Sequence, residues 1–415
     1  MKLKTLVPIL IVSWLLTLVT LSGIFVSIWD YPKGENVKIR GQVFPGGRYA
    51  EDVEVEGNYA YVAMHNENPR ESDSLGIFNI SEKNNPIEVG SCSIKGPPWA
   101  IALSGDYAYI SYSIELDNYT HENHLAIVDV DQKSAPKKIS DCTLSFDWFD
   151  YNAKYRYRNS RYSRVEGVAV VGDHVYVADG GFHIVNVSDK ENPVEVHHNY
   201  PYGAYDVAVV GDYAYLADGT LTILDISNRS NPLEISNTTG YYASAAVMVE
   251  GNYAYIAAGE DGLVIIDISN KTDPRKVGHC SSSDVVEDVA VSGNHAYVAG
   301  RYEGMSVIDV SNKNAPRKIG YFDYDSVASY ESIYGEAGGI ACDDDYIYRA
   351  DMSRGLLILE YENGYDRYDG SILSCLKRET FLLFASILWG LVALPVAYPS
   401  STKREEMAKR GMNQK

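Results

Sequence analysis

The histidines and the acidic residues beside them are the first candidates for chemistry in this 415-residue chain. His121 and His124 stand three residues apart with Glu122 between them, and imidazole and carboxylate groups are common ligands of divalent metals. No helical pattern aligns the pair, so we place it in a long loop. We expect the other histidines to have acidic neighbours only by chance, with His197 and His198 in a loop. We therefore predict no resident metal or other cofactor, and keep His121 and His124 as the residues that would bind a metal.

Acidic side chains recur at two further kinds of position. An aspartate ends several short apolar runs, such as Leu221–Asp225 and Leu263–Asp267. This repetition indicates a structural role, in which the carboxylate accepts backbone N–H bonds in the following turn. Residues 343–345 are three consecutive aspartates that could accept calcium, but they lack EF-hand or nonapeptide ligand spacing. Because the chain also lacks the G-x-S-x-G, P-loop and C-x-x-C patterns, we predict that it is not an enzyme.

The segment of most unusual composition is Thr143–Arg164, which combines seven aromatic and five basic side chains in an acidic chain. Tyr, Trp and Arg are the residues most often found at binding hot spots. Aromatic rings also stack on sugars, and guanidinium groups bind carboxylates. The residues that we expect to contact a ligand are Trp148, Phe149, Tyr151, Tyr155, Arg156, Tyr157, Arg158 and Arg161. The alternative is a loop that folds back and covers the mouth of the domain.

These candidates lie between the strands of an internal repeat that occurs seven times. Each unit starts with a short alternating strand (a) that ends at Gly-Asn or Gly-Asp, a strong hairpin signal. A strand with the pattern Tyr-Ala-Tyr-Val-Ala (b) follows, then an apolar strand (c), a Ser-Asn-x-x-x-Pro turn and a last strand (d). Four antiparallel strands in each ~40-residue unit are typical of propeller blades. We therefore predict an all-β fold, a seven-bladed β-propeller of four-stranded antiparallel blades.

The two ends of the repeat region complement each other. The seventh unit, Ile340–Asn363, ends after strand c, and Val37–Val43 resembles the d strands of the other units. We predict that this N-terminal strand completes the last blade and closes the ring. Both ends of the propeller then lie at the end of the blades that carries the c–d turns. The longer b–c and d–a connections, including Met64–Ser74 and Ser111–His124, occupy the opposite end, where we expect ligand contacts.

The apolar run Leu263–Asp267 and its copies, with the Gly-Asn-Tyr-Ala-Tyr hairpins, resemble the LVIVD-repeat propellers of bacterial and archaeal surface proteins. The resemblance covers residues 37–363 and implies a propeller at the cell surface. It implies no activity, because that family shares no set of catalytic residues.

Both ends of the chain carry apolar segments of the length that crosses a bilayer, for which about 20 helical residues are needed. We predict a transmembrane signal anchor at residues 1–29, with a cleaved signal peptide as the alternative. We predict a second transmembrane helix at residues 380–398, with a buried core helix as the alternative. The propeller at residues 37–363 and a juxtamembrane linker at 364–379 lie between them. The basic tail at 399–415 and the N-terminus are then cytoplasmic by the positive-inside rule, and the propeller is extracytoplasmic.

An extracytoplasmic domain can be glycosylated at Asn-x-Ser/Thr sequons, of which the chain has six. The best candidates are Asn118 and Asn237, which we place in outward loops. Asn228 and Asn270 belong to the c–d turns and are further candidates. The other two sequons replace the aspartate of strand c, where strand pairing limits access.

The charge of the chain restricts its partners. The formal net charge is −20, and since both ends are basic, the segment between them is more acidic still. Nucleic acid is excluded because phosphate binding needs a basic surface. We expect a non-catalytic binding, adhesion or scaffold module whose partner is a surface protein or a glycan. The alternatives are an extracytoplasmic enzyme with a metal in the propeller funnel and an architectural component of a surface layer.

Overall fold

The computed structural model describes residues 36–43, 48–66, 73–116, 120–145, 167–199, 203–238, 245–301, 304–322, 337–351 and 354–362. All of them belong to one compact unit, Gly34–Glu362. Their strands form seven sheets, each of four antiparallel strands. The predicted all-β fold of seven four-stranded blades is confirmed.

We number the blades 1 to 7 along the chain, and each sheet runs from its inner strand (a) to its outer strand (d). Blade 1 contains β2 (Arg48–Glu56), β3 (Tyr59–Asn66), β4 (Ser74–Asn79) and β5 (Ile87–Ser93), and blade 2 contains β6 (Pro98–Ser104), β7 (Tyr107–Leu116), β8 (Thr120–Asp129) and β9 (Lys137–Thr143). Blade 3 contains β10 (Gly167–Val171), β11 (His174–Ala178), β12 (Phe182–Asn186) and β13 (Val194–Asn199), and blade 4 contains β14 (Asp206–Val210), β15 (Tyr213–Ala217), β16 (Leu221–Asp225) and β17 (Leu233–Thr238). Blade 5 contains β18 (Ala246–Glu250), β19 (Tyr253–Ala257), β20 (Leu263–Asp267) and β21 (Arg275–Cys280), and blade 6 contains β22 (Val286–Ser292), β23 (His295–Gly300), β24 (Met305–Asp309) and β25 (Arg317–Phe322). Blade 7 contains β26 (Ala337–Cys342), β27 (Ile347–Asp351), β28 (Gly355–Tyr361) and, as its outer strand, β1 (Val37–Val43).

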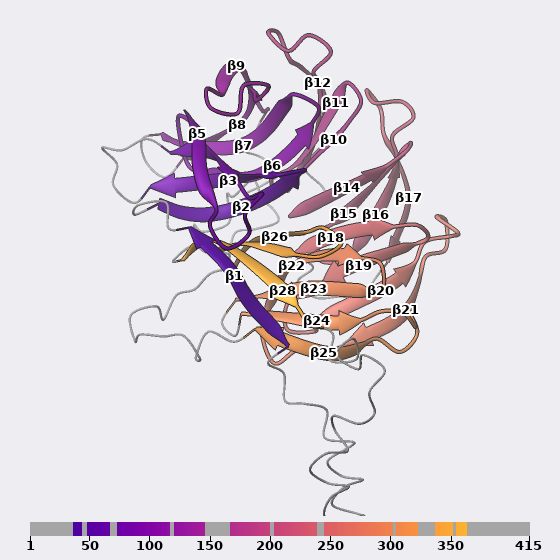
Figure 1. Cartoon of the computed structure of the whole chain (residues 1–415). Helices are drawn as coiled ribbons and strands as arrows, with labels where there is room; N and C mark the ends of the chain where they lie inside the picture. Colours follow the sequence, from indigo (N-terminus) through magenta and orange to yellow (C-terminus); the bar gives the residue numbers. More distant parts are fainter. Residues whose placement is uncertain are drawn as a thin grey trace, which may run out of the picture. The chain divides into compact units, whose positions relative to one another are not determined.

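The blades form a closed ring. The inner strands contact one another in the order β2, β6, β10, β14, β18, β22 and β26, and β26 contacts β2 again. The predicted closure is confirmed, because β1 pairs antiparallel with β28, from Val37 opposite Tyr361 to Val43 opposite Leu356. Figure 1 shows the indigo β1 beside the yellow β28. Strands from both ends of the propeller therefore share one sheet.

Local sequence explains the turns of each blade. Six a–b hairpins have a glycine with φ between +57° and +62°, a conformation that costs glycine little. Blade 7 lacks this glycine, and there the Asp343 carboxylate accepts the backbone N–H groups of Asp345 and Tyr346 at 2.9 and 2.7 Å. The side chain that ends strand c accepts a backbone N–H two residues later at 2.8–3.0 Å in all six c–d turns. The predicted structural role of these residues is confirmed.

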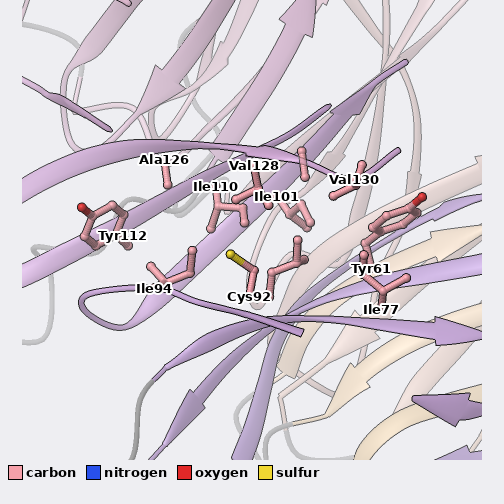
Figure 2. Close-up of a cluster of buried hydrophobic side chains, with 12 residues drawn as sticks. Tyr61, Ile77, Cys92, Ile94, Ile101, Ile110, Tyr112, Ala126, Val128 and Val130 are labelled. Atoms are coloured by element: carbon pink, nitrogen blue, oxygen red, sulfur yellow. The ribbon is translucent and has the colours of Figure 1, made fainter. Parts of the chain in front are cut away.

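The hydrophobic core is divided among the interfaces between blades. Seven clusters of buried side chains are present, and each joins two neighbouring blades. Figure 2 shows the cluster in which Ile77 and Cys92 of blade 1 meet Ile110 and Val128 of blade 2. Because each blade packs against two others, the stability of the domain depends on an unbroken ring.

The c–d turns hold each blade to the one before it. In five turns a lysine places its ammonium group over tyrosine rings in strand b of the preceding blade or, for Tyr346, just before it, 5.0–5.9 Å from the ring centroid. These lysines are Lys83, Lys133, Lys190, Lys271 and Lys313. The contacts give a second reason, beyond strand propensity, for the 34 tyrosines of the chain.

The backbone of each turn also fits against strand d of the preceding blade. A Cβ atom on Gly90 in β5 would overlap the carbonyl oxygen of Lys133, and in two other blades a serine hydroxyl donates to the equivalent carbonyl at 2.6 Å. A Cβ atom on Gly41 of β1 would likewise overlap the carbonyl oxygen of Lys83. Strand β1 thus makes the contacts of a true d strand.

Replacing Lys133 with methionine should weaken one of these contacts without changing the fold. We expect the free energy of unfolding to fall by about 1 kcal/mol, because the ammonium group lies over Tyr59 and Tyr61. The matched control is Lys137→Met, a substitution of an exposed lysine at the start of β9. Equal urea midpoints for the two variants would show that the ring contacts contribute nothing.

Candidate binding site

The predicted ligand-binding insertion lies mostly outside the described residues. All eight of its predicted contact residues fall within 146–166, for which no structure is described. The flanking residues are described: Leu144 is buried, and the backbone N–H of Ser145 donates to both carboxylate oxygens of Glu195, at 3.2 and 3.3 Å. The chain returns as Gly167, the first residue of β10. The insertion is therefore fixed at its base to blades 2 and 3, at the b–c end.

The prediction that His121 and His124 lie in a loop is wrong. Strands β7 and β8 continue as a hairpin whose ladder extends to Leu116 opposite Thr120. Both residues therefore belong to strand β8. His124 is buried and stacks on Tyr112, with ring centroids 5.0 Å apart.

A chain of hydrogen bonds crosses the b–c end of blade 2 towards blade 3. The indole N–H of Trp99 donates to the Ser113 hydroxyl at 3.0 Å, and that hydroxyl donates to the Asn123 amide oxygen at 3.0 Å. The Asn123 amide nitrogen donates to Oδ2 of Asp179 at 2.8 Å. Ser113, Asn123 and Asp179 are all buried, so the bonds are shielded from water.

The chain of bonds continues through a fully buried imidazole. His183 Nε2 lies 2.8 Å from Oδ1 of Asp179, and His183 Nδ1 lies 2.6 Å from Oε1 of Glu195. Glu195 in turn accepts the backbone N–H of Ser145 at the base of the insertion. We call the whole set, from Trp99 to Ser145, the blade 2–3 relay. It connects the inner strand of blade 2 with the starting point of the insertion.

Two neighbouring carboxylates keep His183, at the centre of the blade 2–3 relay, in its protonated form. Burial alone would lower the pKa of His183, but the carboxylates of Asp179 and Glu195 raise it to about 9. Burial opposes ionisation of the two acids, yet contact with His183 keeps the pKa of each below its ordinary value. An imidazolium thus lies between two carboxylates at neutral pH. Since His183 is fully buried, this group orients its neighbours and has no access to a substrate.

The charge of His183 gives the stability of the fold a defined pH dependence. The pKa of His183 is about 9 in the folded protein and 6.5 in the unfolded chain. The charged imidazole therefore stabilises the fold fully below pH 6.5, and this stabilisation is lost as the pH rises through about 9. We expect the thermal midpoint of the full chain to fall across this interval, and that of His183→Gln to fall less. Parallel midpoint curves for the two proteins would contradict the assignment of charge.

Sequence reasoning missed this relay and treated the histidines as unpaired. It also placed His197 and His198 in a loop, whereas both belong to strand β13. A signal was present: His183 interrupts the apolar run that leads to Asn186 in strand c of blade 3, and an aspartate precedes His183 by four residues. Asp218 and Thr222 of blade 4 have the same four-residue spacing, and the Thr222 hydroxyl donates to Asp218 at 2.7 Å.

Three aspartates of the inner strands form a separate set of buried acids. Asp52, Asp206 and Asp288 each accept one backbone N–H from their own strand and one from the inner strand of the next blade, at 2.7–2.8 Å. The equivalent positions in the other blades hold glycine or alanine, and a Cβ atom on Gly167 or Gly339 would overlap the neighbouring carboxylate. These acids join blades, and burial raises the pKa of Asp206 to about 7 and that of Asp288 to about 6.

The candidate glycosylation sites differ in their surroundings. Asn237 lies in strand β17, and its amide donates to Thr222 at 2.7 Å, so its predicted place in an outward loop is wrong. Asn228 and Asn270 are exposed in c–d turns, as predicted. Asn118 lies outside the described residues.

The described residues contain no group of three or more His, Cys, Asp or Glu side chains that could hold a metal ion. They also contain no helix long and apolar enough to cross a membrane. The predicted membrane segments at 1–29 and 380–398 lie outside the ranges that the structure describes.

The fold defines the chain as a seven-bladed β-propeller built from one repeated unit. The family model of the LVIVD repeat matches residues 47–94, 95–143, 164–199, 203–239, 243–282 and 285–323. The chain belongs to the LVIVD-repeat family, as its apolar c strands predicted. These six matches correspond to blades 1 to 6, and the structure adds the composite blade 7.

Comparison with solved structures supports the architecture alone. The crystal structure of the computationally designed Ika8 protein is similar to this chain at a TM-score of 0.50 and 9% sequence identity. The similarity covers 78% of this chain and 99% of the designed one. No curated protein matches the chain in sequence.

Proposed function

We propose that the chain is a non-catalytic propeller, anchored to a membrane at both ends, that captures a surface protein or a glycan with the b–c end of its blades. The LVIVD-repeat propeller fold supports a binding or scaffold role in general. The finer assignment rests on the difference between the two ends of the blades.

The b–c end has what a binding face needs. Blade 2 extends there as the β7–β8 hairpin, and the aromatic and basic insertion leaves the same end after Ser145. The observation that carries the proposal is the bond from Ser145 to Glu195, which fixes the base of the insertion to the buried His183. A variable segment on a rigid base is the usual construction of a binding loop.

The c–d end suits the side that faces a membrane. Strand β1 starts there and β28 ends there, with Val37 opposite Tyr361, so both predicted membrane segments connect to this end. Most exposed large aliphatic side chains of the described residues also lie at this end, namely Ile87, Val171, Val194, Val210 and Leu233. The b–c end then points away from the bilayer.

The proposal is tested with the full chain in a membrane preparation. Residues 146–166 are replaced by a short Gly-Ser linker, and capture of components from a cell-surface extract is compared with that of the unmodified chain. The matched control shortens residues 323–336, the other long d–a connection. We expect the first change to abolish capture and the second to leave it intact. Equal capture by all three proteins would refute the role of the insertion.

A further inference from the structure

A row of three aromatic rings lies at the b–c end, outside the insertion. It consists of Tyr49 in β2, His65 in β3 and Trp99 in β6, and we call it the aromatic row. We propose that the aromatic row binds the apolar face of neutral sugar units, so that the captured partner is a neutral glycan. This inference rests on the proposed binding face and adds to it a site built from described strands.

The strands position the three rings in sequence. Tyr49 and His65 are directly opposite each other in the β2–β3 ladder, with ring centroids 6.3 Å apart and an interplanar angle of 27°. His65 and Trp99 are 6.4 Å apart at 31°. Such separations are those of interacting aromatic rings, and they bring side chains of blades 1 and 2 into one row.

Trp99 owes its place to an irregularity in strand β6. The pairing with β7 shifts register between Pro98 and Ala100, so Trp99 is the extra residue of a β-bulge. Bulges reorient a side chain and are over-represented next to functional sites. The indole is then fixed by its bond to the Ser113 hydroxyl, the first bond of the blade 2–3 relay.

The row is ordered by hydrogen bonds and partly exposed. His65 Nδ1 lies 2.8 Å from Oδ1 of Asp73, and the backbone N–H of Asn66 donates to the same oxygen at 2.8 Å. The His65 side chain remains 28% exposed, and Tyr49 and Trp99 are partly exposed. Partly exposed aromatic rings beside hydrogen-bonding groups match a sugar ring, which has an apolar C–H face and polar hydroxyls at its rim.

Two observations favour a neutral glycan over other partners. The net charge of −20 repels acidic polysaccharides. Among the described residues at the b–c end, Leu116 is the sole exposed large aliphatic side chain, whereas the core of a protein interface is apolar. A protein partner would find little apolar area on these strands, while a sugar needs only the rings.

Binding of soluble oligosaccharides to the full chain tests the inference. Cellotetraose, mannotetraose and chitotetraose serve as neutral probes, and tetragalacturonate as the acidic one. We expect at least one neutral probe to bind in calorimetry and tetragalacturonate to bind more weakly. Trp99→Ala should weaken binding at least about tenfold, or about 1.4 kcal/mol, and Trp99→Phe should restore most of it.

Matched variants separate binding from folding. Tyr205 precedes Asp206 in blade 4 as Trp99 precedes Ala100 in blade 2, and it lies outside the aromatic row, so Tyr205→Ala is expected to leave the affinity unchanged. If Trp99→Ala lowers the thermal midpoint strongly, Tyr49→Ala provides the same test at the outer end of the row. The inference is overturned if no neutral probe binds, if the aromatic variants bind like the parent chain, or if only a protein is captured. Loss of capture on removing the insertion, with no effect of these variants, would retain the proposed function without the sugar site.

Discussion

Substituting aspartate for both Val37 and Ile39 should open the ring of blades and destabilise the whole propeller. These two side chains of β1 pack into the cluster between blades 6 and 7, where Val37 is buried. Each aspartate would place an unpaired charge in an apolar interface, which costs several kcal/mol. We expect the free energy of unfolding to fall by more than about 4 kcal/mol. Urea and thermal unfolding of the full chain measure this loss.

The alternate residues of the same strand provide the control. Lys38 and Arg40 are exposed and form salt bridges with Glu360 and Glu362 of the last strand and the residue after it. The variant Lys38→Ser with Arg40→Ser should lose about 1 kcal/mol or less, because exposed ion pairs contribute little. Similar losses from the two double variants would show that β1 is held only by surface charge and does not complete the core.

The second large effect is expected from His183→Leu. This change removes the imidazolium and leaves the carboxylates of Asp179 and Glu195 facing each other without their partner. Breaking a buried ion pair on one side costs about 3–5 kcal/mol. The base of the insertion at Ser145 would loosen as well, so we expect partner capture to weaken together with stability. Thermal unfolding and capture are measured on the same preparation.

A neighbouring histidine and a double variant test the mechanism of that loss. His198 approaches Glu195 at 3.7 Å but is 47% exposed, so His198→Ala should change stability by less than about 1 kcal/mol. Adding Asp179→Leu to His183→Leu should recover part of the stability, because it removes one of the two uncompensated charges. If the double variant is no more stable than the single one, the loss comes from packing and not from charge.

Sequence alone predicted the features that local pattern controls. Strand c of blades 4 and 5 has the predicted bounds, because a run of mainly apolar residues ends at an aspartate that accepts a backbone N–H in the next turn. The closing strand was also predictable, since the last repeat lacks strand d and Val37–Val43 has its pattern. The predicted b–c connection Ser111–His124 is wrong in its bounds, because strand β7 continues to Leu116; the alternation of polar and apolar residues in Ser111–Leu116 is typical of a strand.

The features that sequence missed depend on neighbouring blades. The partners of His183 come from strand d of its own blade and, through Asp179, from Asn123 of blade 2. In four c–d turns the lysine meets tyrosines of the preceding repeat, from 58 residues earlier for Lys271 and Tyr213 to 83 for Lys190 and Tyr107, whereas Lys83 meets those of the last repeat. The aromatic row likewise combines two blades. No stretch of sequence within one strand contains both partners of these contacts, so they can be identified only from the closed ring.

Hydrogen–deuterium exchange on the full chain, free and with its captured ligand, tests most directly the claim that the b–c end is the binding face. We expect slower exchange on binding at Tyr49, at His65, across Ser113–Leu116 and within 146–166, with no change in the c–d turns. Slower exchange in the c–d turns, with none at the b–c end, would contradict that claim.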